Sequence, residues 1–194
     1  DTFAALGMAH EIDGAGNVVG RYGPSTGPAV VTASHLDSVP AGGIFDGTLG
    51  VIAGLECVRT MIDHDIVPNY GIEIIGTSEE EGRFGGMLGA QALTGNLTLD
   101  WIEKAADEHG FMLTDAMAAA GLDYRAAMHA YRRPETLRAF VELHVEQGPV
   151  LDTEGLSIGV VEGISGVFKW IVRLKGKADH AGTAPMDMRA DAFM

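Results

Sequence analysis

The chain has 194 residues, of which 46% are hydrophobic and 27 are glycine, so it can bury the core of one domain, or of one domain and part of another. Its 27 acidic residues outnumber 13 basic residues and give a formal net charge of -14, which disfavours nucleic acid or an anionic membrane as a partner. No apolar run approaches 20 residues and no charged-then-apolar leader is present, so we expect neither a membrane span nor secretion.

The first third of the chain predicts strands followed by a helix. Residues 8–22 predict two short strands around a Gly-rich reversal, and residues 28–34 (PAVVTAS) predict a buried strand. A helix is predicted over 47–62, because apolar residues recur there at helical spacing: Leu49, Ile52, Leu55, Val58 and Ile62.

The single cysteine, Cys57, lies within this helical pattern. We expect it to be a small buried core residue, because a lone thiol has no disulfide partner in the chain. Such cysteine usage is typical of a reducing compartment and predicts a cytoplasmic protein.

The middle of the chain continues the alternation of strands and helices. Residues 71–78 (GIEIIGTS) and 139–147 (AFVELHVEQ) predict strands. Helical segments between them, over about 98–137, are broken by Gly110, Gly121 and Pro134. This alternation favours an α/β fold with a mostly parallel sheet.

The pattern changes after residue 163. Over 166–175, Trp170, Val172 and Leu174 alternate with charged residues, which predicts a strand with one solvated face. We therefore expect a first domain over 1–163, with the helical insertion, and the beginning of a smaller α+β domain over 164–194.

Polar side chains follow three of the predicted strands at the point where each strand ends. Strand by strand, these groups are His35 with Asp37, Glu79 with Glu80 and Glu81, and His144 with Glu146 and Gln147. In open α/β sheets, the loops at the carboxyl ends of the strands converge on ligand sites. Imidazole and carboxylate suit zinc and similar ions, so the sequence predicts a metal site at this edge. Asp46 can return to the same site on a Gly-rich loop and can bridge two ions.

Each group also has an interpretation without a metal. His35 and Asp37 could form a hydrogen-bonded pair, the Glu79–Glu81 triplet could be a solvated acidic face, and His144 could be packed in the core. Three adjacent carboxylates repel one another, however, unless cations lie among them. The coincidence of all three groups at one sheet edge favours the metal site.

Four motifs occur in an order that is typical of one enzyme family. They are SHLDSVPAGGIFDG, TSEEEGRFGGMLGAQAL, VELHVEQGPVL and GKADHAGTAPMDMRADA, spread over residues 34–192. In these motifs the chain resembles the M20-type metal-dependent amidohydrolases, which include N-carbamoyl-L-amino-acid hydrolase, β-ureidopropionase and allantoate amidohydrolase. The resemblance implies a zinc-aminopeptidase-like catalytic domain followed by the start of a dimerisation domain, and hence a homodimer joined through the smaller domain.

The resemblance also implies roles for individual residues around two divalent metal ions, either zinc or manganese, cobalt or nickel. His35 and His144 would be ligands of different ions, Asp46 would bridge the ions, and Glu81 would be a further carboxylate ligand. Glu80 matches the general base of the family.

Three further positions match supporting roles. Asp37 matches a carboxylate that orients the His35 ring and raises its basicity. His180, in DHAGTAP, matches a substrate-binding histidine of the smaller domain that often reaches the site of the partner subunit. Gln147 matches a substrate-contacting position.

The implied reaction is hydrolysis of a ureido or amide C–N bond in a small molecule, by metal-activated water with Glu80 as base. The resemblance covers roughly the first half of such an enzyme. The remaining histidine ligand and the arginine for the substrate carboxylate would lie beyond Met194, so we do not expect residues 1–194 alone to complete the site. Two alternatives are an M20-type exopeptidase and a non-catalytic truncated relative that acts as a binding protein.

Overall fold

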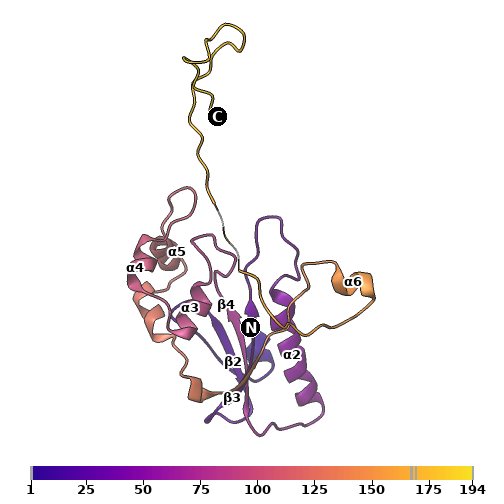
Figure 1. Ribbon diagram of the computed structural model, residues 1–194. Coiled ribbons are helices and arrows are strands. Elements are labelled where there is room, and N and C mark those ends of the chain that lie inside the picture. The colour runs from indigo at the N-terminus through magenta and orange to yellow at the C-terminus, as the bar shows by residue number, and fades with distance from the viewer. Residues whose placement is uncertain (1, 167, 169, 194) are drawn as a thin grey trace. The chain divides into compact units, whose positions relative to one another are not determined.

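The computed structural model describes residues 2–166, 168 and 170–193. The chain divides into two compact units, Asp1–Gln147 and Gly148–Met194. Figure 1 follows the chain through both. None of the helices in the described ranges has the length and apolar character that crossing a bilayer requires.

A five-stranded sheet of order β1-β2-β4-β3-β5 forms the centre of the larger unit. Its strands are Ala9–Ile12 (β1), Val18–Tyr22 (β2), Ala29–His35 (β3), Gly71–Thr77 (β4) and Leu137–Val141 (β5). The neighbours β4, β3 and β5 are parallel, whereas β2 is antiparallel to both β1 and β4. Only β2 therefore runs against the common direction, which confirms the predicted α/β fold with a mostly parallel sheet.

Helices follow β3 and β4, and one helix lies at each end of the described elements. They are Thr2–Ala5 (α1), Thr48–Asp63 (α2), Leu88–Thr94 (α3), Leu99–Lys104 (α4), Leu113–Ala119 (α5) and Val150–Glu154 (α6), with the 3₁₀ helices Tyr124–His129 (η1) and Pro134–Thr136 (η2). The predicted long helix and the predicted helical insertion over about 98–137 are both present.

Both faces of the sheet are covered, with α2 on one side and α3, α4 and α5 on the other (Figure 1). Val58 of α2 and Ile74 of β4 belong to one buried apolar cluster. Ile75, the next residue of β4, belongs to a second cluster, against which Leu93 of α3 packs. Because successive strand residues point to opposite faces, burial on both faces accounts for the nearly continuous apolar run of β4.

The buried face of α2 differs from the predicted one. Val58 is fully buried, but Ile52 is 58% exposed and Cys57 is exposed, so the predicted burial of Cys57 is wrong. The reason is a glycine on the inner face of the helix. A Cβ on Gly54 would lie 2.6 Å from the side chain of Thr32, so the helix approaches the sheet through a position that carries no apolar signal.

The helical insertion has its own core and is tied to the sheet by a buried ion pair. Ile102, Leu113 and Ala127 belong to its apolar cluster. Glu73, a buried residue of β4, pairs with Arg21 of β2 at 2.7 Å and also with Arg132, which follows η1. One carboxylate thus joins two strands to the end of the insertion.

The last strand of the sheet is shorter than predicted. β5 ends at Val141, where it pairs with Thr32, whereas the sequence predicts a strand over 139–147. Beyond this pair the Ser34 hydroxyl donates a hydrogen bond to Glu142 (2.9 Å), so a side-chain contact replaces the backbone ladder. His144 therefore lies in the loop that follows the strand.

The smaller unit contains α6 and loop segments. The strand predicted over 166–175 is not present at Phe168 or Trp170–Lys175, and positions 167 and 169 lie outside the described residues. A strand needs a neighbour for its backbone hydrogen bonds, and the described residues of 148–193 include no strand with which this segment could pair. The predicted domain boundary between 163 and 164 stays a prediction.

We expect Glu73→Gln to lower the free energy of unfolding by about 3 kcal/mol, because it leaves two arginines facing a neutral amide in a buried site. Urea unfolding followed by circular dichroism measures the difference. Glu56→Gln is the matched control, because Glu56 pairs with Arg59 on the exposed surface of α2 and its loss should change the stability by less than about 1 kcal/mol. Equal effects of the two substitutions would contradict the structural role of Glu73.

Candidate metal centre

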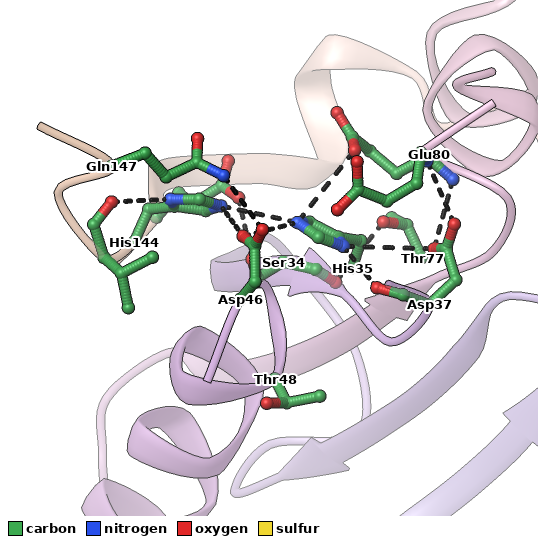
Figure 2. A network of polar contacts seen from close by, with 12 residues as sticks. Ser34, His35, Asp37, Asp46, Thr48, Thr77, Glu80, His144 and Gln147 are labelled. Carbon is green, nitrogen blue, oxygen red and sulfur yellow. Dashed lines mark hydrogen bonds and ion pairs between the residues drawn. The ribbon is translucent and has the colours of Figure 1, made fainter. Parts of the chain in front are cut away.

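Three parallel strands bring the predicted polar groups to one edge of the sheet. His35 is the last residue of β3, the Glu79–Glu81 triplet follows β4, and His144 lies three residues beyond the end of β5. Because β3 lies between β4 and β5, the loops that leave these strands meet at its end. Figure 2 shows His35 at the centre, with His144 on one side and Glu80 on the other.

The ring of His35 is buried and held in one orientation. Its Nδ1 lies 2.8 Å from the main-chain oxygen of Asp37. Because a carbonyl oxygen can only accept, Nδ1 carries the proton and Nε2 presents a lone pair. Gly47 lies against this ring: its φ is +68°, and a Cβ there would be 2.4 Å from Nδ1.

His144 and Asp46 complete a cluster around the free nitrogen of His35. His144 Nδ1 lies 2.9 Å from the main-chain oxygen of Val145, so the Nε2 of His144 also presents a lone pair. The two Nε2 atoms are 3.3 Å apart, and Asp46 Oδ1 lies 3.6 Å from that of His35 and 3.2 Å from that of His144. Two lone pairs and a carboxylate oxygen therefore face one another.

This cluster fits a metal ion. The Oδ1 atom of Asp46 is buried and has no hydrogen-bond donor within the described part of the chain. Buried acceptors of this kind are destabilising unless a cation or a donor reaches them. His35, Asp46 and His144 can offer one atom each to a single ion, and nitrogen with carboxylate oxygen is the donor set that zinc prefers.

Glu80 and Glu81 approach the cluster from the β4 side. Glu80 Oε2 lies 3.9 Å from His35 Nε2, and the two glutamates with His35 form a second group that could hold an ion. Burial, followed by the charges of Asp46 and Glu80, raises the pKa of Glu81. Each carboxylate at this edge thus disfavours the ionised form of its neighbours, whereas a bound cation would favour it.

Glu79, by contrast, points into its own loop. Its carboxylate accepts hydrogen bonds from the main-chain N–H groups of Phe84 (2.6 Å) and Gly86 (3.1 Å), and burial raises its pKa. The Glu79 carboxylate therefore bonds to its own loop rather than to the cluster. The Gly-rich run that follows the triplet marks a tight loop whose N–H groups need acceptors, and this signal could have identified the role of Glu79.

The remaining predicted residues surround this cluster or belong to the smaller unit. The Asp37 carboxylate accepts hydrogen bonds from the N–H groups of Glu80 (3.1 Å) and Glu81 (2.9 Å). Gln147 Nε2 donates to Asp46 Oδ2 at 2.8 Å. His180 belongs to the smaller unit, where its Nδ1 accepts the N–H of Gly182 (3.1 Å).

Comparison with known proteins identifies the family. A model of peptidase family M20/M25/M40 matches residues 31–192. The chain belongs to this family. The family is metal-dependent, in agreement with the group of residues that can hold a metal ion.

Two of the relatives that the chain matches are named as amidohydrolases. The N-carbamoyl-L-amino acid amidohydrolase of Geobacillus stearothermophilus is 45% identical over 185 residues, which are 92% of this chain and 44% of that protein. The allantoate amidohydrolase of Bacillus subtilis is 34% identical over 192 residues, which are 97% of this chain and 46% of that protein.

A solved structure supports the same placement. A hydantoinase/carbamoylase family amidase from Burkholderia ambifaria has a TM-score of 0.74 at 36% identity, covering 99% of this chain and 47% of the other. The family and the fold implied by the sequence motifs are thereby confirmed. The chain spans about half the length of the relatives that it matches.

We expect Gly47→Ala to weaken metal binding about ten- to a hundredfold, because the new methyl group would displace the His35 ring and the residue would have to hold a left-handed conformation. Zinc titration into the metal-free full-length protein, followed by calorimetry, measures the affinity. Gly43→Ala is the control, because a Cβ at Gly43 meets no atom within 4 Å. Equal zinc affinity in the two variants would show that Gly47 does not determine the geometry of the His35 ring.

Proposed function

We propose that the full-length protein hydrolyses a non-peptide C–N bond in N-carbamoyl amino acids or in related ureido compounds such as allantoate. The names of relatives at 45% and 34% identity support this substrate class. The structural observation that carries the proposal is the meeting of two imidazole lone pairs with the buried oxygen of Asp46. This arrangement suits a hydrolytic metal site.

Two divalent ions are the proposed cofactors, zinc in the first place, with manganese, cobalt or nickel as alternatives. His35 and His144 would each offer Nε2 to a different ion, Asp46 would lie between the ions, and Glu81 would add a carboxylate from the β4 side. When bound, such ions lower the pKa of water toward neutrality and polarise the carbonyl under attack. The raised pKa of Glu81 supports the assignment, because its carboxylate lies among other carboxylates that a cation would stabilise.

Glu80 is the proposed general base. Its carboxylate faces the ligand cluster, 3.9 Å from His35 Nε2, whereas that of Glu79 is bonded to its own loop. A base in this position takes a proton from the attacking water as the O–C bond forms and returns it to the leaving nitrogen as the C–N bond breaks. A carbamoyl amino acid would yield the amino acid and carbamic acid, which decomposes to carbon dioxide and ammonia.

Gln147 and His180 are the proposed substrate contacts. Gln147 already reaches the ligand cluster through its hydrogen bond to Asp46. His180 belongs to the Gly148–Met194 unit and would bind substrate from there. The resemblance of the DHAGTAP motif to that of the family supports this substrate contact. The His180 imidazole could donate a hydrogen bond to the developing oxyanion.

We further propose a homodimer joined through the smaller unit and a cytoplasmic location. Trp170, Val172 and Leu174 are 83%, 75% and 54% exposed, and exposed apolar side chains of this kind support a protein interface. The free thiol of Cys57 supports a reducing compartment.

We expect Glu80→Gln to keep its metal and lower the turnover number about a hundred- to ten-thousandfold, because it removes a positioned base but no ligand. Glu81→Gln should instead lose metal, with lower activity as a consequence. The paired measurements are metal stoichiometry and turnover with N-carbamoyl amino acids, allantoate and a dipeptide. Turnover by Glu80→Gln at nearly the parent rate would rule out the base assignment, and cleavage of the dipeptide alone would favour an exopeptidase.

We expect the full-length protein to bind two divalent ions per subunit and His144→Ala to reduce the occupancy of one ion more than that of the other. The reason is that the two proposed sites share only Asp46. Elemental analysis of protein purified without chelator gives the stoichiometry. His109→Ala is the control, because His109 is exposed in the insertion and should keep both ions. Full activity of the metal-free protein would exclude the metal mechanism.

A further inference from the structure

We propose that Asp37 is a positioning residue that acts on Glu80 through the main chain of the β4 loop, an inference that rests on the proposed function. Its carboxylate accepts the N–H of Glu80 at Oδ1 (3.1 Å) and the N–H of Glu81 at Oδ2 (2.9 Å). Each carboxylate oxygen is thus assigned to one of the two glutamates. Asp37 follows β3 and the glutamates follow β4, so these bonds fix one loop against the other.

The side chain of Asp37 is not the group that orients the His35 ring. The His35 Nδ1 atom lies 2.8 Å from the main-chain oxygen of Asp37 but 3.9 Å from its nearer carboxylate oxygen. A hydrogen bond forms at the first distance and not at the second. The main chain of Asp37 therefore determines the ring tautomer, and its side chain is available for the β4 loop.

The conformation of the β4 loop explains why an anion is needed. Glu79 has a φ of +52°, in the left-handed region that few non-glycine residues adopt. Successive N–H groups after such a residue can point into one concavity, which attracts a negative group. The Asp37 carboxylate lies at the N–H groups of Glu80 and Glu81 and bonds to both, and bonds to an ionised acceptor are stronger than neutral ones.

The consequence for the reaction is positional. Glu80 would act as base from the loop that follows β4. A displacement of a catalytic group by about 1 Å can lower the rate of a catalysed reaction about a hundredfold. Asp37 attaches this loop to the chain segment that carries His35. The base and the buried ligand are thereby held by the same residue, through its side chain and its main chain.

Hydrogen exchange in the metal-free, full-length protein tests the contacts without substrate. The amides of Glu80 and Glu81 should be protected in the parent protein and should exchange at least about tenfold faster in Asp37→Asn, because an amide keeps only one acceptor oxygen. The His35 tautomer, read from ¹⁵N chemical shifts, should stay unchanged, since its partner is a main-chain carbonyl. Unprotected amides in the parent, or a changed tautomer with unchanged exchange, would overturn the proposal.

Kinetics then test whether Asp37 acts through Glu80. Asp37→Asn should lower kcat about ten- to a hundredfold and leave KM within about twofold. The double variant Asp37→Asn/Glu80→Gln should be no slower than Glu80→Gln alone, within about twofold, because the base that Asp37 positions is already absent. Losses that multiply in the double variant would overturn the proposal.

Asp123→Asn is the matched control for a lost capping carboxylate. Asp123 accepts the N–H of Arg125 (3.0 Å) at the start of η1 in the insertion, so its loss should leave kcat and the exchange at Glu80 and Glu81 unchanged. A protein that turns over none of the substrates, yet loses amide protection in Asp37→Asn, would support the contacts of Asp37 and overturn the hydrolytic function.

Discussion

The site depends on a group of hydrogen-bond acceptors that face and repel one another. The Nδ1 atoms of His35 and His144 both face main-chain carbonyls, so both Nε2 atoms present lone pairs, 3.3 Å apart and close to a buried oxygen of Asp46. An unsatisfied buried acceptor such as Asp46 Oδ1 destabilises a fold by about 1 to 3 kcal/mol. The main-chain bonds and Gly47 hold the side chains in this arrangement. A cation that binds here attracts the lone pairs and the carboxylate that otherwise repel one another. Metal binding should therefore stabilise this edge of the sheet.

The three adjacent glutamates show how one short run can serve three purposes. Glu79 satisfies the N–H groups of its own loop, Glu80 faces the ligand cluster, and Glu81 has a raised pKa among neighbouring carboxylates. Of the three, Glu79 alone adopts a left-handed conformation, with a φ of +52°. Backbone geometry, rather than side-chain identity, therefore distinguishes three identical residues.

Features that depend on the periodic spacing of apolar residues could be predicted from the sequence, whereas individual side-chain contacts could not. The strands β1 to β4, the long helix and the convergence of polar groups follow from periodicity and from the position of each group at a strand end. The exposure of Cys57 was missed because glycine lets α2 approach the sheet. The early end of β5 and the loop bonds of Glu79 depend on individual hydrogen bonds. Such bonds join atoms whose proximity only the folded chain establishes.

The end of β3 and the segment that follows it contact both neighbouring loops of the site. Asp37 bonds to the loop after β4, while Asp46 bonds to Gln147 and Ser34 bonds to Glu142 in the loop after β5. The central place of β3 in the sheet makes this possible, because its end lies next to those of β4 and β5. Side chains from the two outer loops are therefore positioned against one segment of the chain. His35 lies at the end of this strand, so Glu80 from the β4 loop and His144 from the β5 loop can both approach its Nε2.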